Sequence, residues 1–375
     1  MFIYFAVILF CFLLSTVKLP KSIENSALIL IAFFLCFGYT TGTDWYAYEQ
    51  FYNNRLLAIE SSKTGEFGYF YLQTLIGGLG VGFWIFHIAI KLLVFYSLIS
   101  FVRRFDINLF LFLALFIPEA GLYLFIDCPF RNLIALGISL IAYNKLFDNK
   151  TLSYFIYVFI AMTFHVTAII MIPIYFVYKK DIKITFAIIS TVIIYSFAFN
   201  IDFLISNIYT PLIKISPTLG ERLEGYLFDS RFISDKINAG SFIRLFILFI
   251  LLLFKEKIIS GDKYRSYILN LSILFLIFYP LGVSLKVFQR FTLFLFPFYT
   301  LSILYLLKSL EIKTNKYILT MFFVLFSFMQ TYKTVSMDFR YVPYTNYMIH
   351  SIKQDFQSID YRYQYNRKHS PYKKL

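Results

Sequence analysis

From residue 69 to residue 337 the chain is a succession of hydrophobic blocks, each about long enough to cross a lipid bilayer. Hydrophobic residues make up 59% of the sequence and charged residues only 15%, whereas soluble domains carry about 25% charged residues. Charged groups kept at membrane depth are costly, so the few that remain there are candidates for function. The sequence therefore excludes a soluble protein and predicts an all-α, polytopic integral membrane protein with a polar site.

Apolar runs of roughly 17–25 residues are long enough to span a bilayer, and the chain contains roughly 10–12 such candidate helices. We expect them near 2–17, 26–40, 82–101, 107–126, 131–147, 152–178, 182–205, 241–254, 266–285, 291–308 and 317–337. Two polar stretches, 41–68 and 206–240, are predicted to be external loops. Residues 1–337 are expected to form a single helical membrane domain, followed by a basic, Tyr-rich tail over 338–375.

The net charge of +14 is explained by membrane topology. Lys and Arg gather in short loops beside apolar spans, as the positive-inside rule requires, so no nucleic-acid partner is predicted. Segment 152–178 decides the topology because basic residues flank both of its ends. It either crosses once or is broken at His165, with both ends cytoplasmic. We favour the broken form because it gathers both polar loops and the polar residues described below on one external face.

Aromatic residues and carboxylates are concentrated after the second span, in the run G-T-D-W-Y-A-Y-E-Q-F-Y over 42–52. A further carboxylate, in E-F-G-Y over 66–69, precedes an amphipathic segment. This composition is typical of sugar binding, and the alternative is an interfacial aromatic belt with solvated acids. The candidate residues are the carboxylates of Asp44 and Glu66 and the rings of Trp45, Tyr48 and Tyr69.

Arg131 and His165 interrupt otherwise apolar sequence. Arg131 opens a span just after Pro129, and both a helix N-terminus and a guanidinium group favour phosphate oxygens. The alternative is an Arg131 paired with Asp127 or reaching toward lipid headgroups. His165 can hydrogen-bond a sugar hydroxyl or a phosphate, or move a proton, and the alternative is a packing residue.

Further basic residues lie beside later spans. Lys286 and Arg290 are four residues apart, which places them on one face of a helix. Arg222 and Arg231 lie in the polar stretch 206–240. Cations facing an external cavity fit an anionic substrate that carries a diphosphate, although Arg222 and Arg231 are also explained as ordinary loop charges.

His87 and Lys91, also four residues apart, lie inside the third predicted span. They either line a cavity, or Lys91 pairs with an Asp or Glu from a neighbouring helix. The chain lacks the nucleotide-binding motifs G-x-x-x-x-G-K-[ST] and G-x-G-x-x-G and the zinc motif H-E-x-x-H. Its three cysteines are scattered and show no metal-site spacing, so no cofactor and no metal are predicted.

Five short motifs in order resemble the EpsG-like branch of the Wzy polymerases, bacterial enzymes that polymerise O-antigen or capsule repeat units. Their order and spacing cover most of residues 38–300. At position 67 the family pattern usually has Pro where this chain has Phe. The motifs are Gly42-Thr43-Asp44 with Tyr48 and Phe51, Glu66-x-Gly68-Tyr69, Arg131-Asn132-x-Ile134-Ala135, Phe164-His165 before Thr167-Ala168, and Arg290-Phe291.

This resemblance implies a metal-independent glycosyltransferase of the lipid-linked-sugar type in the bacterial inner membrane. A growing glycan on undecaprenyl diphosphate would be transferred, at the periplasmic face, to a lipid-linked repeat unit, giving O-antigen, capsule or exopolysaccharide. Arg131 and Arg290 would hold the diphosphate, and Asp44, Glu66 or His165 would orient or deprotonate the acceptor hydroxyl. The expected partners are the two lipid-linked glycans and membrane lipids, with a chain-length regulator as a further candidate.

Two other functions remain open from the residues. A flippase for lipid-linked oligosaccharide also needs a cationic cavity, but it predicts paired helical repeats and charge near the membrane midplane. A membrane acyltransferase that modifies glycans typically carries basic residues and His near its N-terminus. The first 40 residues contain neither His nor Arg.

Overall fold

The computed structural model describes residues 1–54, 66–203, 238–336 and 340–356, with positions 59, 206, 207, 214, 358, 361, 364 and 368. Every regular element in these ranges is a helix, which confirms the predicted all-α class. The chain divides into two compact units, Met1–Ile169 with Lys313–Leu375, and Ile170–Ile312. A single membrane domain over 1–337 stays a prediction.

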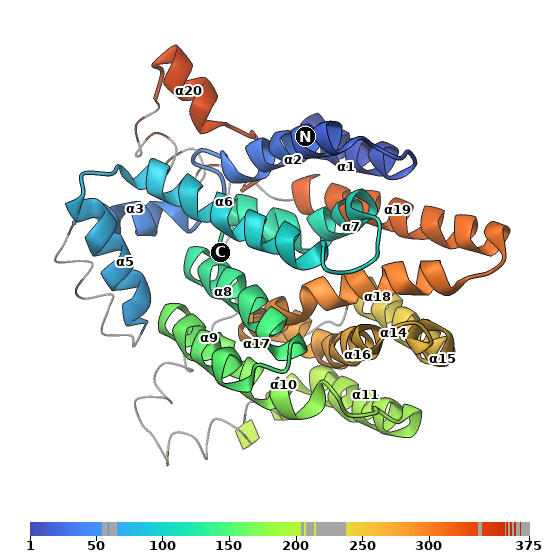
Figure 1. Cartoon of the computed structure of the whole chain (residues 1–375). Coiled ribbons are helices and arrows are strands. Elements are labelled where there is room, and N and C mark those ends of the chain that lie inside the picture. Colours follow the sequence, from blue (N-terminus) through green and yellow to red (C-terminus); the bar gives the residue numbers. More distant parts are fainter. Residues whose placement is uncertain are drawn as a thin grey trace. The chain divides into compact units, whose positions relative to one another are not determined.

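The first unit contains the N-terminal helices and the last long helix, in which α8 packs against both α6 and α9, and α19 against α1 and α7 (Figure 1). Two turns of π-helix, η1 and η2, extend α7. The elements are α1 (Phe2–Ser15), α2 (Lys21–Cys36), α3 (Trp45–Asn53), α5 (Phe67–Gly78), α6 (Phe83–Val102), α7 (Leu109–Phe116), η1 (Ile117–Gly121), η2 (Tyr123–Asp127), α8 (Phe130–Phe147), α9 (Thr151–Phe164), α19 (Lys313–Ser336) and α20 (Tyr347–Lys353).

The second unit is built around α16, which packs against α11, α14, α17 and α18. Its helices are α10 (Met171–Val177), α11 (Ile184–Phe199), α14 (Ala239–Leu253), α15 (Lys255–Ile259), α16 (Lys263–Ser284), α17 (Lys286–Thr292), the 3-10 turn η4 (Leu293–Leu295) and α18 (Phe296–Ser309). Another 3-10 turn, η3 (Val166–Ile170), leads from the first unit into the second.

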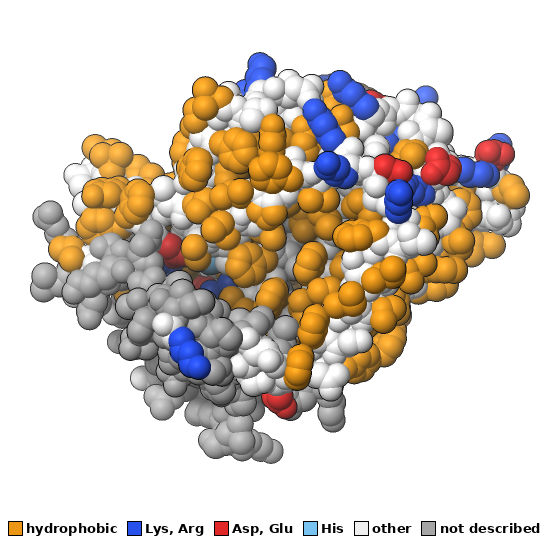
Figure 2. Space-filling model, turned by 90° about the horizontal axis from the view of Figure 1, so that it is seen from below, with side chains coloured by type: hydrophobic (Ala, Val, Ile, Leu, Met, Phe, Trp, Pro, Cys, Tyr) orange, Lys and Arg blue, Asp and Glu red, His pale blue; other side chains and the backbone are white. Residues whose placement is uncertain are grey.

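Among the described residues, four helical stretches are long and apolar enough to cross a membrane: α6, α16, α17 with α18, and α19. Several shorter apolar helices accompany them, and apolar side chains cover most of the described surface seen in Figure 2. Helix α6 has the polarity expected in lipid, because Leu93 and Tyr96 are exposed whereas His87 and Lys91 are buried. The protein is therefore a polytopic, all-α membrane protein, as predicted.

The predicted segment 152–178 is not a continuous helix. Helix α9 ends at Phe164, His165 adopts an extended conformation with φ −152° and ψ 123°, and the 3-10 turn η3 follows before α10 begins. The interruption falls at the residue where the sequence suggested it. The sides of the membrane that this segment connects stay a prediction.

The segment after α19 pairs with the loop after α2, and both belong to the first unit. An isolated β-bridge joins Gly38 to Asn346. Three backbone hydrogen bonds support it: Tyr39 N to Thr345 O at 2.9 Å, Gly42 N to Arg340 O at 2.8 Å, and Tyr347 N to Phe37 O at 2.8 Å.

This pairing bears on the topology because α2 and α19 must end on the same side of the membrane. If each predicted span after 26–40 crossed once, the number of crossings between these ends would be odd, and the ends would lie on opposite sides. A segment 152–178 that enters and leaves on one side makes the number even. The pairing therefore favours the broken form of 152–178.

Candidate functional site

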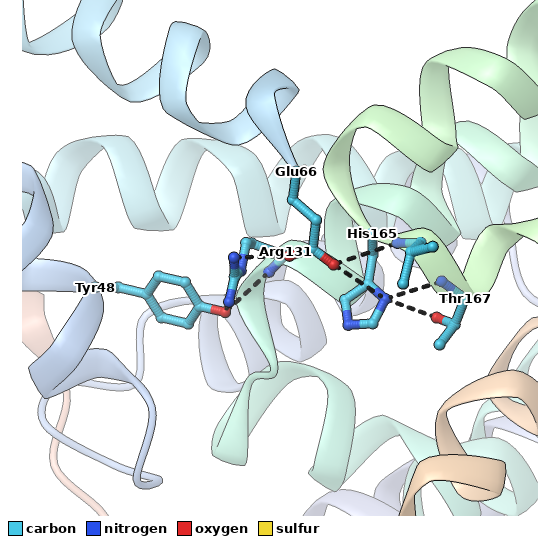
Figure 3. A network of polar contacts seen from close by, with 6 residues as sticks. Tyr48, Glu66, Arg131, His165 and Thr167 are labelled. Atoms are coloured by element: carbon cyan, nitrogen blue, oxygen red, sulfur yellow. Dashed lines mark hydrogen bonds and ion pairs between the residues drawn. The ribbon is translucent and has the colours of Figure 1, made fainter. Parts of the chain in front are cut away.

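Three predicted site residues meet in the first unit, where the Glu66 carboxylate pairs with Arg131 and lies beside the ring of His165 (Figure 3). Oε2 of Glu66 lies 2.7 Å from Nη1 of Arg131, and Oε1 lies 3.7 Å from Nδ1 of His165. The same Oε1 accepts a hydrogen bond of 3.3 Å from the backbone N–H of Val166. The Glu66 side chain is only 11% exposed and that of Arg131 28%, so the ion pair is partly shielded from water and open on the arginine side.

A close helix crossing puts Glu66 in this place. Glu66 is the N-cap of α5, and Gly68 in the first turn of that helix lies against Thr163 near the end of α9. A Cβ atom at Gly68 would lie 2.3 Å from Oγ1 of Thr163 and 3.0 Å from its carbonyl carbon. Only glycine allows this approach, which explains why the E-x-G-Y motif needs its third residue.

Arg131 is held from the other side by an aromatic group. Its Nε and backbone N–H lie 3.4 and 3.5 Å from the hydroxyl oxygen of Tyr48, which accepts from both. The Tyr48 ring packs edge-on against Tyr69 and Phe130, with centroid separations of 5.3 and 5.7 Å. Burial raises the pKa of Tyr48 to about 12, so its phenol stays protonated at neutral pH. The guanidinium group is therefore fixed between a carboxylate and a neutral hydroxyl.

The contacts of His165 assign its protonation. The backbone N–H of Thr167 donates to Nδ1 of His165 at 3.2 Å, and the Thr167 hydroxyl lies 2.7 Å from the same nitrogen. A backbone N–H can only donate, so Nδ1 must be an acceptor and the proton of the neutral ring lies on Nε2. The Nδ1 to Glu66 distance of 3.7 Å is too long for a hydrogen bond. The proton that His165 can donate in a hydrogen bond is therefore the one on Nε2.

Asp44 and Trp45 stand at the start of α3. Asp44 is its half-buried N-cap and accepts a hydrogen bond of 3.3 Å from the Thr43 hydroxyl. Trp45 is buried against Trp84, with ring centroids 5.7 Å apart. The catalytic role predicted for Asp44 and the sugar-binding roles of Trp45, Tyr48 and Tyr69 stay predictions.

Glu49, one turn after Trp45, was not singled out from the sequence. Its Oε1 accepts a hydrogen bond of 3.1 Å from Nε1 of Trp84, and its Oε2 is buried with no hydrogen-bond partner among the described residues. Burial raises the pKa of Glu49 to about 7, and the hydrogen bond from Trp84 partly opposes this. The only signal in the sequence was a carboxylate within an aromatic run.

The sequence left open a pairing of Arg131 with Asp127, but Arg131 pairs with Glu66. Asp127 instead holds the G-T-D loop: its Oδ2 lies 2.5 Å from Nη1 of Arg340, and its Oδ1 accepts from the backbone N–H of Thr43 at 3.2 Å. Gly42 is required here because its φ is +83° and a Cβ would lie 2.4 Å from the Asp127 carbonyl oxygen. Nothing in the sequence pointed to Arg340, which follows the last span.

Lys286 and Arg290 lie on α17 in the second unit, four residues apart on one short helix as predicted. The chain reaches α17 through an extended Leu285 with φ −127° and ψ 113°. Their shared diphosphate site with Arg131 stays a prediction, and Arg222 and Arg231 lie outside the described residues. Within the described residues, no group of three or more His, Cys, Asp or Glu side chains is placed to hold a metal ion.

Comparison with known protein families matches the chain to the EpsG family over residues 23–346. Comparisons with curated proteins and with solved structures return no match. The matched range contains the whole Glu66–Arg131–His165 cluster and the segment 340–346 that pairs with the loop after α2. The family match identifies the chain as a polysaccharide-related, multi-pass membrane protein. The chain belongs to the EpsG family.

Proposed function

We propose that this protein is a glycosyltransferase that polymerises undecaprenyl-diphosphate-linked oligosaccharide repeat units at the periplasmic face of the bacterial inner membrane. The observation that carries the proposal is the Glu66 carboxylate, which pairs with the Arg131 guanidinium group and lies beside the ring of His165. The family match supports it, because it ties the chain to polysaccharide production. The product would be O-antigen, capsule or exopolysaccharide.

Arg131 would bind the diphosphate of the donor. In the free protein its Nη1 contacts Glu66 and its Nε contacts Tyr48, which leaves the Nη2 donors of the guanidinium group for phosphate oxygens. Guanidinium groups bind phosphate through two parallel hydrogen bonds, and the positive charge would stabilise the negative charge that develops on the leaving diphosphate. The Arg290 and Lys286 side chains of α17 are further candidates for this role.

Glu66 and His165 would act on the acceptor. A diphosphate bound at Nη2 shares the positive charge of Arg131 with Glu66, so its arrival would weaken the ion pair and let the carboxylate accept the proton of the acceptor hydroxyl. The bond from the sugar C1 to the diphosphate oxygen breaks, a bond from C1 to the acceptor oxygen forms, and undecaprenyl diphosphate leaves as an anion. The Nε2–H of His165 would donate a hydrogen bond to a substrate oxygen, which makes His165 an orienting group and Glu66 the base.

The test uses purified protein in lipid nanodiscs with a lipid-linked repeat unit and no other enzyme. Arg131→Ala should lower the rate of polymer formation about 100- to 1,000-fold, the usual cost of removing one donor that stabilises transition-state charge. Arg103→Ala is the matched control, because Arg103 makes a comparable ion pair with Glu24 outside the cluster. Polymer formation should continue in EDTA, as a metal-independent reaction requires.

Two results would decide against the proposal. Normal chain lengths with Arg131→Ala would remove this residue from the site, and a requirement for a divalent cation would contradict the mechanism. In cells, deletion of the gene should leave single repeat units on the surface glycan. Loss of all surface glycan would instead indicate a flippase, which moves the lipid-linked unit before any polymerisation.

A further inference from the structure

Helix α5 presents a row of large apolar side chains on the face turned away from the site. Phe67, Tyr71, Leu75 and the C-cap Leu79 follow one another at intervals of four residues, which places them on one side of the helix. Their exposed fractions are 51, 66, 64 and 71%. Residues 67–82 contain no Asp, Glu, Lys or Arg. A continuous exposed apolar row of this kind marks a surface that meets a partner, and we call it the α5 row.

The N-terminal end of α5 lies at one end of the helix bundle in the first unit. The first turns of α6 and α8 meet there, because the rings of Phe86 and Phe130 pack edge-on with centroids 5.6 Å apart. Tyr69 of α5 packs on the same Phe130 ring at 5.8 Å between centroids. Gly68 lies against Thr163, one residue before the end of α9. This end of α5 therefore touches the start of α8 and the end of α9.

The C-terminal end of α5 lies at the same end of the bundle. Tyr52 of α3 donates a hydrogen bond of 2.7 Å to the carbonyl oxygen of Val81, and a Cβ atom added at Gly77 would lie 3.6 Å from its ring. The Tyr52 ring also stacks on Phe86, in the first turn of α6, at 5.3 Å between centroids. Helix α5 therefore runs across the ends of α6, α8 and α9 and not alongside them (Figure 1).

A helix in this position is too short to cross the membrane. The 12 residues of α5 give a length of about 18 Å, whereas the hydrocarbon core is about 30 Å thick. An uncharged row that begins with Phe and Tyr is typical of a helix lying in the membrane interface, where such helices insert one apolar face among the lipid chains. On α5 the opposite face packs on protein, through Gly68 and Tyr69.

The lipid-facing side of α6 identifies the partner of the α5 row. Helix α6 is long and apolar enough to span a membrane, and only residues 79–82 separate it from α5. Its exposed apolar side chains begin at Ile85, in its first turn, and recur at Leu93. Lipid that covers α6 therefore extends to its first turn, six positions beyond Leu79 (85 minus 79). This continuity favours the bilayer over a second protein as the partner of the row.

We propose that α5 is an in-plane membrane helix whose apolar row, Phe67, Tyr71, Leu75 and Leu79, lies among the lipid chains of one leaflet. Its partner is the lipid surface itself. Because Glu66 is the N-cap of α5, this contact would fix the depth of the Glu66–Arg131 ion pair at the boundary between the headgroups and the chains. The proposal concerns the placement of α5 and does not depend on glycosyl transfer.

Spin labels measure this depth directly in the full-length protein in phosphatidylcholine nanodiscs. Single cysteines replace Tyr71, Leu75 or Leu79, and the unsubstituted protein is the labelling blank because its three native cysteines are buried. Leu93→Cys, on the exposed side of α6, gives the reference for lipid. Lys150→Cys, at the exposed N-cap of α9, gives the reference for water. Each label is relaxed with oxygen, which concentrates in lipid, and with a water-soluble nickel chelate.

An in-plane helix should give the same depth at all three positions, with stronger relaxation by oxygen than at Lys150→Cys. A helix that enters the membrane end-on would instead give depths about 12 Å apart between positions 71 and 79, from eight positions at about 1.5 Å each. Stronger relaxation by the nickel chelate would show that the row faces water. Protection from both reagents would show that another protein chain covers it. Each of these three results would overturn the proposal.

A second set of labels leaves every side chain of the row in place. Thr74 and Gly78 are exposed beside the row, and no atom lies within 4 Å of a Cβ atom added at Gly78. Labels at Thr74→Cys and Gly78→Cys should report the same depth as the first set, and the melting temperatures of all variants should equal that of the unsubstituted protein. A shallower, water-exposed reading at both positions would contradict the in-plane placement even if a substitution within the row disturbed the fold.

Discussion

Gly68→Ala should disable the candidate site through one added methyl group. The new Cβ would lie 2.3 Å from Oγ1 of Thr163 and 3.0 Å from its carbonyl carbon, and ordinary van der Waals contact begins at 3.4 Å, so the two helices must separate by up to 1.1 Å (3.4 minus 2.3 Å). A shift of that size along the Glu66–Val166 hydrogen bond would lengthen it from 3.3 to about 4.4 Å, beyond hydrogen-bonding range. Overpacking of this kind destabilises a protein by about 1–3 kcal/mol, and a misplacement of about 1 Å at a site can lower the rate about 100-fold.

A matched control exists on the same helix. Gly78 ends α5, and no atom lies within 4 Å of a Cβ added there, so Gly78→Ala should leave both stability and polymer formation unchanged. Adding Thr163→Ala to Gly68→Ala removes the nearest atom and leaves contacts at 3.0 Å, which reduces the required shift to 0.4 Å (3.4 minus 3.0 Å). The double variant should therefore regain part of the lost activity.

The assay measures polymer formation in nanodiscs together with the melting temperature of each purified variant. The expected order of rates is wild type equal to Gly78→Ala, then the double variant, then Gly68→Ala. If Gly68→Ala makes polymer at the wild-type rate, the close approach of α5 and α9 is not needed and the proposed role of Glu66 is wrong. If the double variant is no better than Gly68→Ala, the contact with Thr163 is not the cause.

Three further outcomes are expected. Burial raises the pKa of Glu49 from 4.5 to about 7, so the folded state holds this proton more tightly than the unfolded state. The contribution of this proton to the free energy of unfolding is full below pH about 4.5 and is lost as the pH rises to about 7. Glu49→Gln should flatten the melting temperature over this range, and an unchanged slope would contradict the assigned cause. His165→Gln, whose amide N–H replaces the Nε2–H, should retain more polymerase activity than His165→Asn, whereas equal loss would contradict the assigned tautomer. In a cysteine-free background, single cysteines at the exposed positions 166 and 348 should react with an impermeant reagent from the same side of the membrane, the outside, and labelling from opposite sides would contradict the topology.

The sequence predicted best those features of the structure that residues close together in the chain determine. Bilayer-length apolar runs predicted the helices. The basic residues at both ends of 152–178, and the single external face that a break would give the polar residues, favoured an interruption, which falls at His165. Short motifs also selected Glu66, Arg131 and His165, which the fold brings together. These features depend on composition and spacing, which a single sequence contains.

Long-range contacts could not be predicted in the same way. Asp127 was a plausible partner for Arg131, four residues away, yet it pairs with Arg340, which is 213 positions later in the chain. Glu49 became notable only when Trp84 was found beside it. Which carboxylate meets which cation depends on helix packing, and neither composition nor spacing contains that information.

The bridge between Gly38 and Asn346 has a consequence for biogenesis. A ribosome delivers the N-terminal loop early and residues 340–347 only after every described membrane helix has been made. Until then the Asp127 carboxylate lacks the guanidinium group of Arg340, and the G-T-D loop lacks the chain segment that pairs with it. Nascent chains halted before this point would already contain Glu66, Arg131 and His165, but their G-T-D loop would not yet be held by Arg340, so this contact must form late in synthesis.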